Sequence, residues 1–304
     1  SNFPFLKNGI VYFNHASTGP FSSIVVNRLS NLLKEKSESK IDDYVSFLKV
    51  VDETKHLLAQ LINCDISRTA FVDNTSNGLN ILAQSINWKK GNRILLNDVE
   101  FPANVYPFLN LKRFGVEVDF VKSENGIVTA EQIINSIKPG TKLVSVSFVQ
   151  FLSGYKIDLE KIGKYCRAND IIFCVDGIQG IGAVRIDVKK CNIDFLSCGT
   201  QKWLLGMQGL AFIFVDEELQ KKIYPANVGW LSVENAWNLL DYKLDLKTSA
   251  NVFQGGTLNT FGIYAFNTSL NLFNDFGFDN VESEVLSNTK YFINKLKAIG
   301  LDCV

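Results

Sequence analysis

An aspartate and a lysine are the side chains best suited to chemistry in this sequence. Asp176 ends the apolar run IIFCVD, and a carboxylate at the carboxyl end of a central strand lies where open α/β sheets place their ligand crevice. Lys202 lies in DFLSCGTQKWLLG, between two strand-like runs and beside Trp203. Each residue alone has an ordinary interpretation, because an acid after a strand is often a helix cap and a lysine before an apolar stretch is usually on the surface.

Three other side chains follow strand-like runs in the same way. Thr75 and Ser76 open a helix directly after the run AFVD, where free backbone N–H groups and hydroxyls can hold a phosphate. Phe101 follows RILLND, and a ring at this edge could stack on a flat cofactor. An ordinary N-cap and ordinary core packing are the alternatives for these positions.

One ligand accounts for all of these residues together. Thr75 and Ser76 would hold a phosphate, Phe101 would cover an aromatic ring, Asp176 would keep a ring nitrogen protonated, and Lys202 would capture an aldehyde. Those groups belong to pyridoxal 5'-phosphate, whose enzymes use a lysine Schiff base and an acidic partner for the pyridinium nitrogen. The sequence therefore predicts pyridoxal phosphate as the cofactor.

Six segments in order resemble those of fold-type-I, class V aminotransferase-like enzymes, a family that includes cysteine desulfurases, selenocysteine lyases and isopenicillin-N-epimerase-like proteins. The resemblance spans nearly the whole chain. The segments are YFNHASTGP at 12–20, NTSNGLNIL at 74–82, EFPANVYP at 100–107, VDGIQGIGAV at 175–184, SCGTQKWLLGMQGLAF at 197–212 and FQGGTLN at 253–259.

The resemblance implies a role for each matching residue. Lys202 is similar to the lysine that forms the aldimine, and Asp176 to the partner of the pyridinium nitrogen. Gln179 is expected to bond the cofactor's phenolic oxygen, and Gln150 to lie near the substrate and that oxygen. Thr257 is similar to a threonine that reaches the phosphate of a neighbouring subunit, which implies a homodimer with shared active sites.

The same resemblance places Asn14 and His15 at the substrate. Where desulfurases have Ser-Gly-His before the lysine, this chain has Gly199-Thr200-Gln201, so Thr200 or Gln201 is expected to supply part of the phosphate contact.

Two further departures concern the substrate. Phe101 occupies the place that histidine fills in desulfurases, which removes a proton donor near the ring. Members of the family dock the substrate's carboxylate on an arginine in the C-terminal domain, and this sequence has no arginine after Arg185. An arginine suits that task because its planar fork meets a carboxylate with two hydrogen bonds.

The type of reaction stays open at this point. Transamination of a small amino acid is the first expectation, with desulfurase- or selenocysteine-lyase-type elimination, or epimerisation, as the alternative. A catalytically silent pyridoxal-phosphate-binding protein is a third interpretation. A nicotinamide enzyme is not favoured, because the glycines of 177–182 have the wrong order for the dinucleotide fingerprint.

The elements that must position these residues alternate between apolar runs of strand length and amphipathic stretches of helical period. This rhythm predicts an α/β fold with a mainly parallel sheet flanked by helices. The resemblance implies a pyridoxal-phosphate-dependent transferase fold of type I, with an N-terminal segment (1–20) that packs with the small domain, a large cofactor-binding domain (21–262) and the start of a small α+β domain (263–304). Helices are predicted over 260–276 and 284–300, and a strand over 301–304. A strand at that place suggests that the small domain is incomplete.

Composition narrows the other possibilities. The 31 basic and 31 acidic residues balance, which favours neither nucleic acid nor an anionic membrane as a partner. The sequence lacks the layout of a signal peptide and any apolar run of bilayer length, and six scattered cysteines suit reduced thiols. Together these features predict a cytoplasmic enzyme that acts on a small molecule. Because only His15 and His56 are present, a histidine-rich metal centre is not expected.

Overall fold

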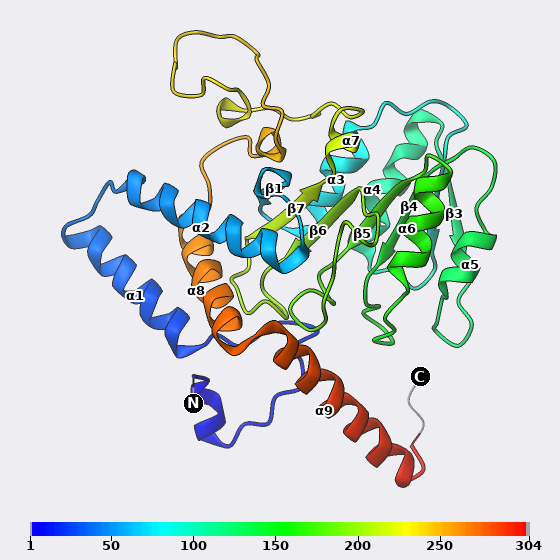
Figure 1. Ribbon diagram of the computed structural model, residues 1–304, viewed down its shortest axis with the longest axis horizontal. Helices are drawn as coiled ribbons and strands as arrows, with labels where there is room; N and C mark the ends of the chain where they lie inside the picture. Colours follow the sequence, from blue (N-terminus) through cyan, green and yellow to red (C-terminus); the bar gives the residue numbers. More distant parts are fainter. Residues whose placement is uncertain (1, 302–304) are drawn as a thin grey trace.

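A seven-stranded sheet forms the centre of the computed structural model, which describes residues 2–301 (Figure 1). The order of strands is β1-β7-β6-β5-β4-β2-β3. Strands β2 to β6 pair in parallel, whereas β7 is antiparallel to both β6 and β1. The strands are β1 (Thr69–Val72), β2 (Arg93–Asn97), β3 (Glu117–Val121), β4 (Thr141–Ser147), β5 (Ile172–Asp176), β6 (Phe195–Gly199) and β7 (Ala211–Val215).

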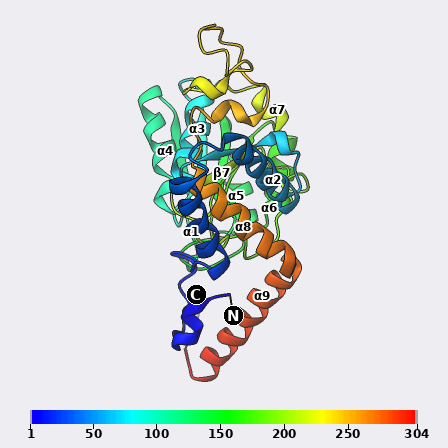
Figure 2. The same ribbon diagram turned by 90° about the vertical axis from the view of Figure 1, so that its left-hand side faces the viewer.

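Helices cover both faces of this sheet. Helices α3 and α4 pack on one face, and α2, α5, α6 and α8 pack on the other (Figure 2). The helices are α1 (Ser23–Glu38), α2 (Tyr44–Ile62), α3 (Thr75–Ser85), α4 (Tyr106–Leu109), α5 (Ala130–Asn135), α6 (Leu159–Ala168), α7 (Glu217–Gln220), α8 (Thr260–Phe276) and α9 (Phe278–Ala298). Short 3₁₀ turns lie at Pro4–Asn8, Ile66–Arg68, Pro102–Asn104, Asn110–Phe114, Trp230–Ser232 and Ala250–Phe253.

The apolar runs of the sequence form the central strands. Every residue of β6 and β7 is buried, because helices cover both faces and alternation with polar residues is not needed. The predicted α/β fold with a mainly parallel sheet is thereby confirmed. Strand β3 escaped prediction, since it lies at the sheet edge and its sequence EVDFV mixes exposed and half-buried residues.

One predicted amphipathic stretch, at 104–115, is more irregular than a helix. It consists of the short helix α4 flanked by two 3₁₀ turns. Pro102 and Pro107 lie in this region, and each lacks the N–H group that a continuous helix would require.

The C-terminal region contains two helices. Helix α8 matches the predicted range 260–276, and it packs against α1 and α2. It therefore runs across the predicted domain boundary at residue 262, and the division into domains stays a prediction. Helix α9 begins six residues before the predicted start at 284, has no buried residue and extends away from the sheet (Figures 1 and 2). Of the strand predicted over 301–304, only Leu301 is described, and it is in no strand.

The N-terminal segment contacts two parts of the molecule. The Phe13 ring stacks on Phe292 of α9, with 5.9 Å between the ring centroids. The N–H of Gly19 donates a hydrogen bond to the Gln201 carbonyl at 2.8 Å, so this segment also packs against the turn that carries Lys202. Within residues 2–301, no helix combines the length and the apolar character that a bilayer crossing requires.

Gly78 of α3 allows a close approach of this helix to the sheet. A Cβ atom at this position would lie 2.2 Å from Ser197 Oγ and 2.8 Å from Ile213 Cγ2. Only glycine therefore lets the start of α3 lie against β6 and β7, next to the ends of the strands that carry the predicted site.

We predict that Gly78→Ala lowers the free energy of unfolding by about 1–3 kcal/mol through overpacking. The matched control is Gly256→Ala, because a methyl group there would meet only Trp230 Nε1, at 3.9 Å. Denaturant unfolding of both variants measures the effect. Equal stability of the two variants would contradict the tight contact between α3 and β6.

Candidate active site

The predicted site residues gather where the parallel strands end. Asp176 is the last residue of β5, and Lys202 lies in the turn that follows β6. Gln150 and Phe101 follow β4 and β2. Because the carboxyl ends of neighbouring parallel strands meet at one edge of a sheet, segments far apart in the sequence supply a single site.

Lys202 and Phe101 face each other at this edge. The ammonium Nζ lies 5.7 Å from the centroid of the Phe101 ring, whose own edge contact is with Phe151 at 5.3 Å. Burial lowers the pKa of Lys202, while the carboxyl of Asp176 and the thiol of Cys198 oppose this shift. A lowered pKa leaves a larger fraction of the amine neutral, which is the form that attacks an aldehyde.

Asp176 is a buried acid without an ion-pair partner in the described part of the chain. Its side chain is 2% exposed, and one oxygen accepts a hydrogen bond from the Ile178 N–H at 3.0 Å. Burial, with a further contribution from the charge of Glu100, raises the pKa of Asp176 to about 7, although the Ile178 N–H and Lys202 act in the opposite direction. A cation placed against this carboxyl would compensate for the burial.

The N-terminus of α3 is capped by Asn74, and not by Thr75 or Ser76, which are predicted to bind phosphate. Asn74 caps the helix by accepting a hydrogen bond from the Asn77 N–H at 2.8 Å. Thr75 and Ser76 are therefore not needed as caps, and the hydroxyl of Thr75 is buried with no hydrogen-bond partner among the described residues. Ser76 is exposed, and it lines an open cavity of about 520 Å³ together with Phe101.

Gly199 lets the side chains of Gln201 and Thr75 approach the end of β6 closely. A Cβ atom at Gly199 would lie 2.5 Å from Gln201 Oε1 and 3.2 Å from Thr75 Oγ1. The polar ends of Gln201 and Thr75 therefore lie near each other at the N-terminus of α3, where backbone N–H groups favour an anion.

Thr200 is placed differently from Gln201. Its hydroxyl is completely buried and hydrogen-bonds the carbonyls of Met207 and Leu210, each at 3.0 Å. The hydroxyl is thus engaged with the loop before β7. Of Thr200 and Gln201, Gln201 is the one whose side chain lies near the Thr75 hydroxyl at the N-terminus of α3.

Gln179 joins the N-terminal segment to the lysine turn. Its amide donates a hydrogen bond to the Ala16 carbonyl at 2.9 Å and accepts one from Trp203 Nε1 at 3.1 Å. The ring of His15 stacks on Trp203, with 5.4 Å between the centroids, and burial lowers the pKa of His15. The structure therefore connects both residues to the neighbour of Lys202.

Asn14 and Thr257 lie further out. Asn14 is exposed, and its carbonyl accepts a hydrogen bond from the Tyr12 hydroxyl at 3.1 Å. Thr257 is exposed and lines a separate cavity of about 270 Å³ with Asp73 and Asn77. The structure does not bring Thr257 to the cavity that Phe101 and Ser76 share.

The sequence reasoning missed Glu100, which is buried directly before Phe101. Its carboxylate accepts hydrogen bonds from five neutral donors, and Gln150 is one of these donors. Its position in the sequence, shortly after the apolar run RILLN and directly before Phe101, could have indicated a role. An acid at that edge of a sheet is seldom left without hydrogen-bond partners.

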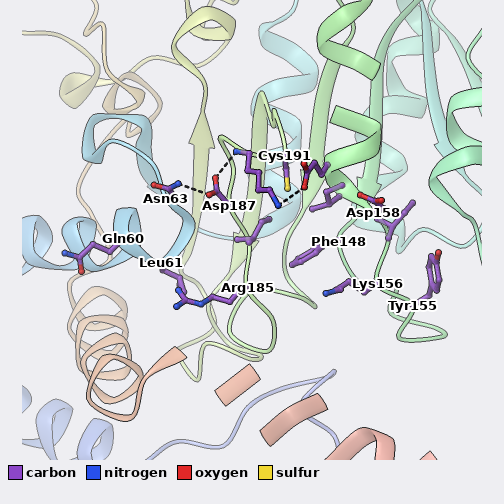
Figure 3. Close-up of a pocket in the computed structure, with 15 residues that line it drawn as sticks. Gln60, Leu61, Asn63, Phe148, Tyr155, Lys156, Asp158, Arg185, Asp187 and Cys191 are labelled. Atoms are coloured by element: carbon purple, nitrogen blue, oxygen red, sulfur yellow. Dashed lines mark hydrogen bonds and ion pairs between the residues drawn. The ribbon is translucent and has the colours of Figure 1, made fainter. Parts of the chain in front are cut away.

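A second open cavity, of about 710 Å³, lies near the C-terminus of α2 and contains none of the predicted site residues (Figure 3). Some of its polar side chains have partners: Lys190 pairs with Glu160 at 2.9 Å, and Asn63 donates a hydrogen bond to Asp187 at 2.8 Å.

Pyridoxal phosphate fits the groups at the sheet edge. The unpartnered Thr75 hydroxyl at the N-terminus of α3 suits its phosphate, and the buried Asp176 suits a protonated ring nitrogen. Phe101 offers a ring that is 44% exposed for stacking. The oxygen of the Gln150 amide is also buried without a partner in the described chain, and it can accept one further hydrogen bond.

Comparison with known proteins agrees with this fit. The family model described as aminotransferase class-V matches residues 11–302. A probable cysteine desulfurase of Ureaplasma parvum serovar 3 is 28% identical over 98% of this chain and 76% of its own length.

Solved structures share the fold. The apo structure of the cysteine desulfurase from Thermococcus onnurineus NA1 superposes with a TM-score of 0.85, at 23% identity, over 97% of this chain and 76% of that one. A mutant of C-DES with glycine covalently linked to its PLP cofactor also has a TM-score of 0.85, at 22% identity, over 94% and 76% of the two chains. The chain belongs to the class V aminotransferase family and is a pyridoxal-phosphate-dependent enzyme of fold type I.

Proposed function

We propose that this enzyme breaks the carbon–sulfur bond of a cysteine-type amino acid. The observation that carries the proposal is a partly buried Lys202 amine of lowered pKa, which faces Phe101 at the same sheet edge as the buried Asp176. Membership of the class V family supports the cofactor chemistry. The choice of a sulfur substrate is supported by the similarity to proteins named cysteine desulfurase.

Each residue has a distinct task in this proposal. The bound cofactor supplies an aldehyde that captures amines and a ring that accepts electrons. Lys202 would hold the cofactor through its amine, and the same amine would act as the base that takes the proton from the substrate's α carbon. Asp176 keeps the ring nitrogen protonated, and Phe101 holds the plane of the ring. Thr75, Ser76 and Gln201 hold the phosphate.

The remaining predicted residues lie around this centre. Gln179 and His15 position the lysine turn through Trp203, while Thr200 stabilises the loop before β7. Gln150 and Asn14 are assigned to ligand contacts, Gln150 because its buried oxygen has no partner in the described chain.

Transamination is the second candidate, and one observation favours it. Phe101 has no proton to give at the position where desulfurases have a histidine. Proton transfer would then depend on Lys202 alone, as transamination requires for moving a proton between the α carbon and the cofactor. The two reactions differ in whether the substrate loses its sulfur.

The test supplies purified holoenzyme with L-cysteine and L-cystine and measures sulfide, persulfide, alanine and pyruvate. We expect sulfur release that is lost by about 10²–10⁴-fold or more in Lys202→Ala. Borohydride reduction and peptide mass analysis should place the cofactor on Lys202 in the wild type. Amino transfer to a keto acid without sulfur release would reject the proposal in favour of transamination.

We also propose that the enzyme is a homodimer, located in the cytoplasm as its sequence suggests, in which Thr257 reaches the cofactor phosphate of the partner subunit. Thr257 is exposed and does not line the cavity that Phe101 and Ser76 share. Trp237, Leu240 and Tyr242 expose 63%, 84% and 90% of their surfaces, which is typical of a contact surface.

Light scattering after gel filtration should therefore give a mass near twice the 34.0 kDa of the chain. Leu240→Asp should shift the protein toward the monomer and weaken cofactor binding at the same time, since both sites would lose Thr257. A wild-type monomer that binds the cofactor fully would refute the shared site.

A further inference from the structure

Glu100 is a buried carboxylate held by neutral donors alone. The residue is 7% exposed. Its Oε1 accepts hydrogen bonds from Asn97 Nδ2 at 2.6 Å, the Ser147 N–H at 2.9 Å and Gln150 Nε2 at 2.8 Å. Its Oε2 accepts from Asn104 Nδ2 at 2.9 Å and Ser147 Oγ at 2.5 Å. Five donors therefore satisfy the hydrogen-bonding capacity of this buried carboxylate.

The network fixes the direction of the Gln150 amide. A carboxylate only accepts hydrogen bonds, so the NH₂ group of Gln150 must face Glu100. The amide oxygen is then left buried with no partner in the described chain. By binding the NH₂ group of Gln150, Glu100 leaves the Gln150 oxygen free to accept a hydrogen bond from a ligand.

The same network ties together the segments that carry the site. Asn97 ends β2, Ser147 ends β4, and Asn104 lies in the turn after Phe101. Asn104 is itself fixed by the hydroxyl of Ser145, which donates to its Oδ1 at 2.6 Å. Since Phe101 directly follows Glu100, the place of its ring over Lys202 depends on these contacts.

Glu100 also acts on Asp176 through charge. The negative charge of Glu100 raises the pKa of Asp176, and the positive charge of Lys202 lowers it. The negative charges of Glu100 and Asp176 favour the cationic form of a titratable group that binds at this edge of the sheet.

We propose that Glu100 is a positioning residue of the cofactor site, which aims the free oxygen of Gln150 at the bound group and adds a second negative charge that favours the protonated form of the cofactor. The inference rests on the cofactor site and is independent of which substrate is used.

The two roles are separated by two variants. Glu100→Gln removes the charge, and its amide can keep the geometry: the new NH₂ group donates to Ser147 Oγ, while Asn104 turns its amide so that its own NH₂ faces Ser145. Gln150→Ala removes the aimed oxygen and leaves the charge. Glu124→Gln, at an exposed glutamate beyond β3, is the matched control.

The measurements are the dissociation constant of pyridoxal phosphate and the pH midpoint of the visible absorbance of the bound cofactor. Glu100→Gln should lower the midpoint by about 0.5–1 unit, because a negative charge that favours protonation is lost. Gln150→Ala should weaken binding about fivefold or more and leave the midpoint near that of the wild type. Glu124→Gln should change neither quantity.

Several outcomes would overturn the proposal. An unchanged midpoint in Glu100→Gln would show that its charge does not act on the cofactor. Unchanged affinity in Gln150→Ala would show that the aimed oxygen has no ligand partner. Failure of Glu100→Gln to fold, judged by near-ultraviolet circular dichroism, would also count against it, because the proposal requires that an amide preserve the network. If the dissociation constant and the pH midpoint are both unchanged in the variants, this inference is refuted. Any change in sulfur release would then bear on the proposed function alone.

Discussion

The burial of Asp176 at the end of β5 is the constraint on which the rest of the site depends. An acid that is 2% exposed, with one backbone N–H as its hydrogen-bond donor and no ion pair in the described chain, is costly in its charged form. The pKa of about 7 expresses that cost. A protonated pyridine ring placed against this carboxyl would compensate for that cost, so the burial of Asp176 favours a cofactor that carries such a cation.

The other features of the site serve to place groups around that carboxyl. Gly78 brings the N-terminus of α3 against β6, and Gly199 lets the Gln201 side chain lie close to the Thr75 hydroxyl. The Gly19 N–H and Gln179 hold the lysine turn to the N-terminal segment. Glu100 joins β2 to β4 on the opposite side of Asp176. Backbone packing thus sets the positions of the reactive groups, and a few polar side chains fix their directions.

The sequence was sufficient to predict every strand of the sheet except β3, and to place Asp176 and Lys202 after two of these strands. Continuous apolar runs such as AFIFV have one common explanation, a strand buried on both faces, and Asp176 and Lys202 follow directly from their places after such runs. Strand β3 was missed because an edge strand is half exposed and carries polar residues.

The hydrogen-bond networks could not be read from the chain order. Glu100 receives donors from residues up to 50 positions away, and the commitment of the Thr200 hydroxyl to Leu210 depends on the fold of a loop. Asn74, and not Thr75, caps α3, a difference of one residue that propensity does not resolve. Such contacts are set by tertiary structure, whereas periodicity reports only burial.

The most direct test compares the unfolding free energies of wild type and Asp176→Asn across pH, without and with pyridoxal phosphate. Folding raises the pKa of Asp176 from 3.8 to about 7, so the folded protein retains a proton that the unfolded chain loses, and its stability falls as pH rises through that range. Without the cofactor, Asp176→Asn should therefore be more stable by about 1–3 kcal/mol near pH 8, and the difference should vanish near pH 4. With the cofactor, the wild type should gain more stability than the variant. A cofactor-free variant that is less stable than the wild type at every pH would contradict the account.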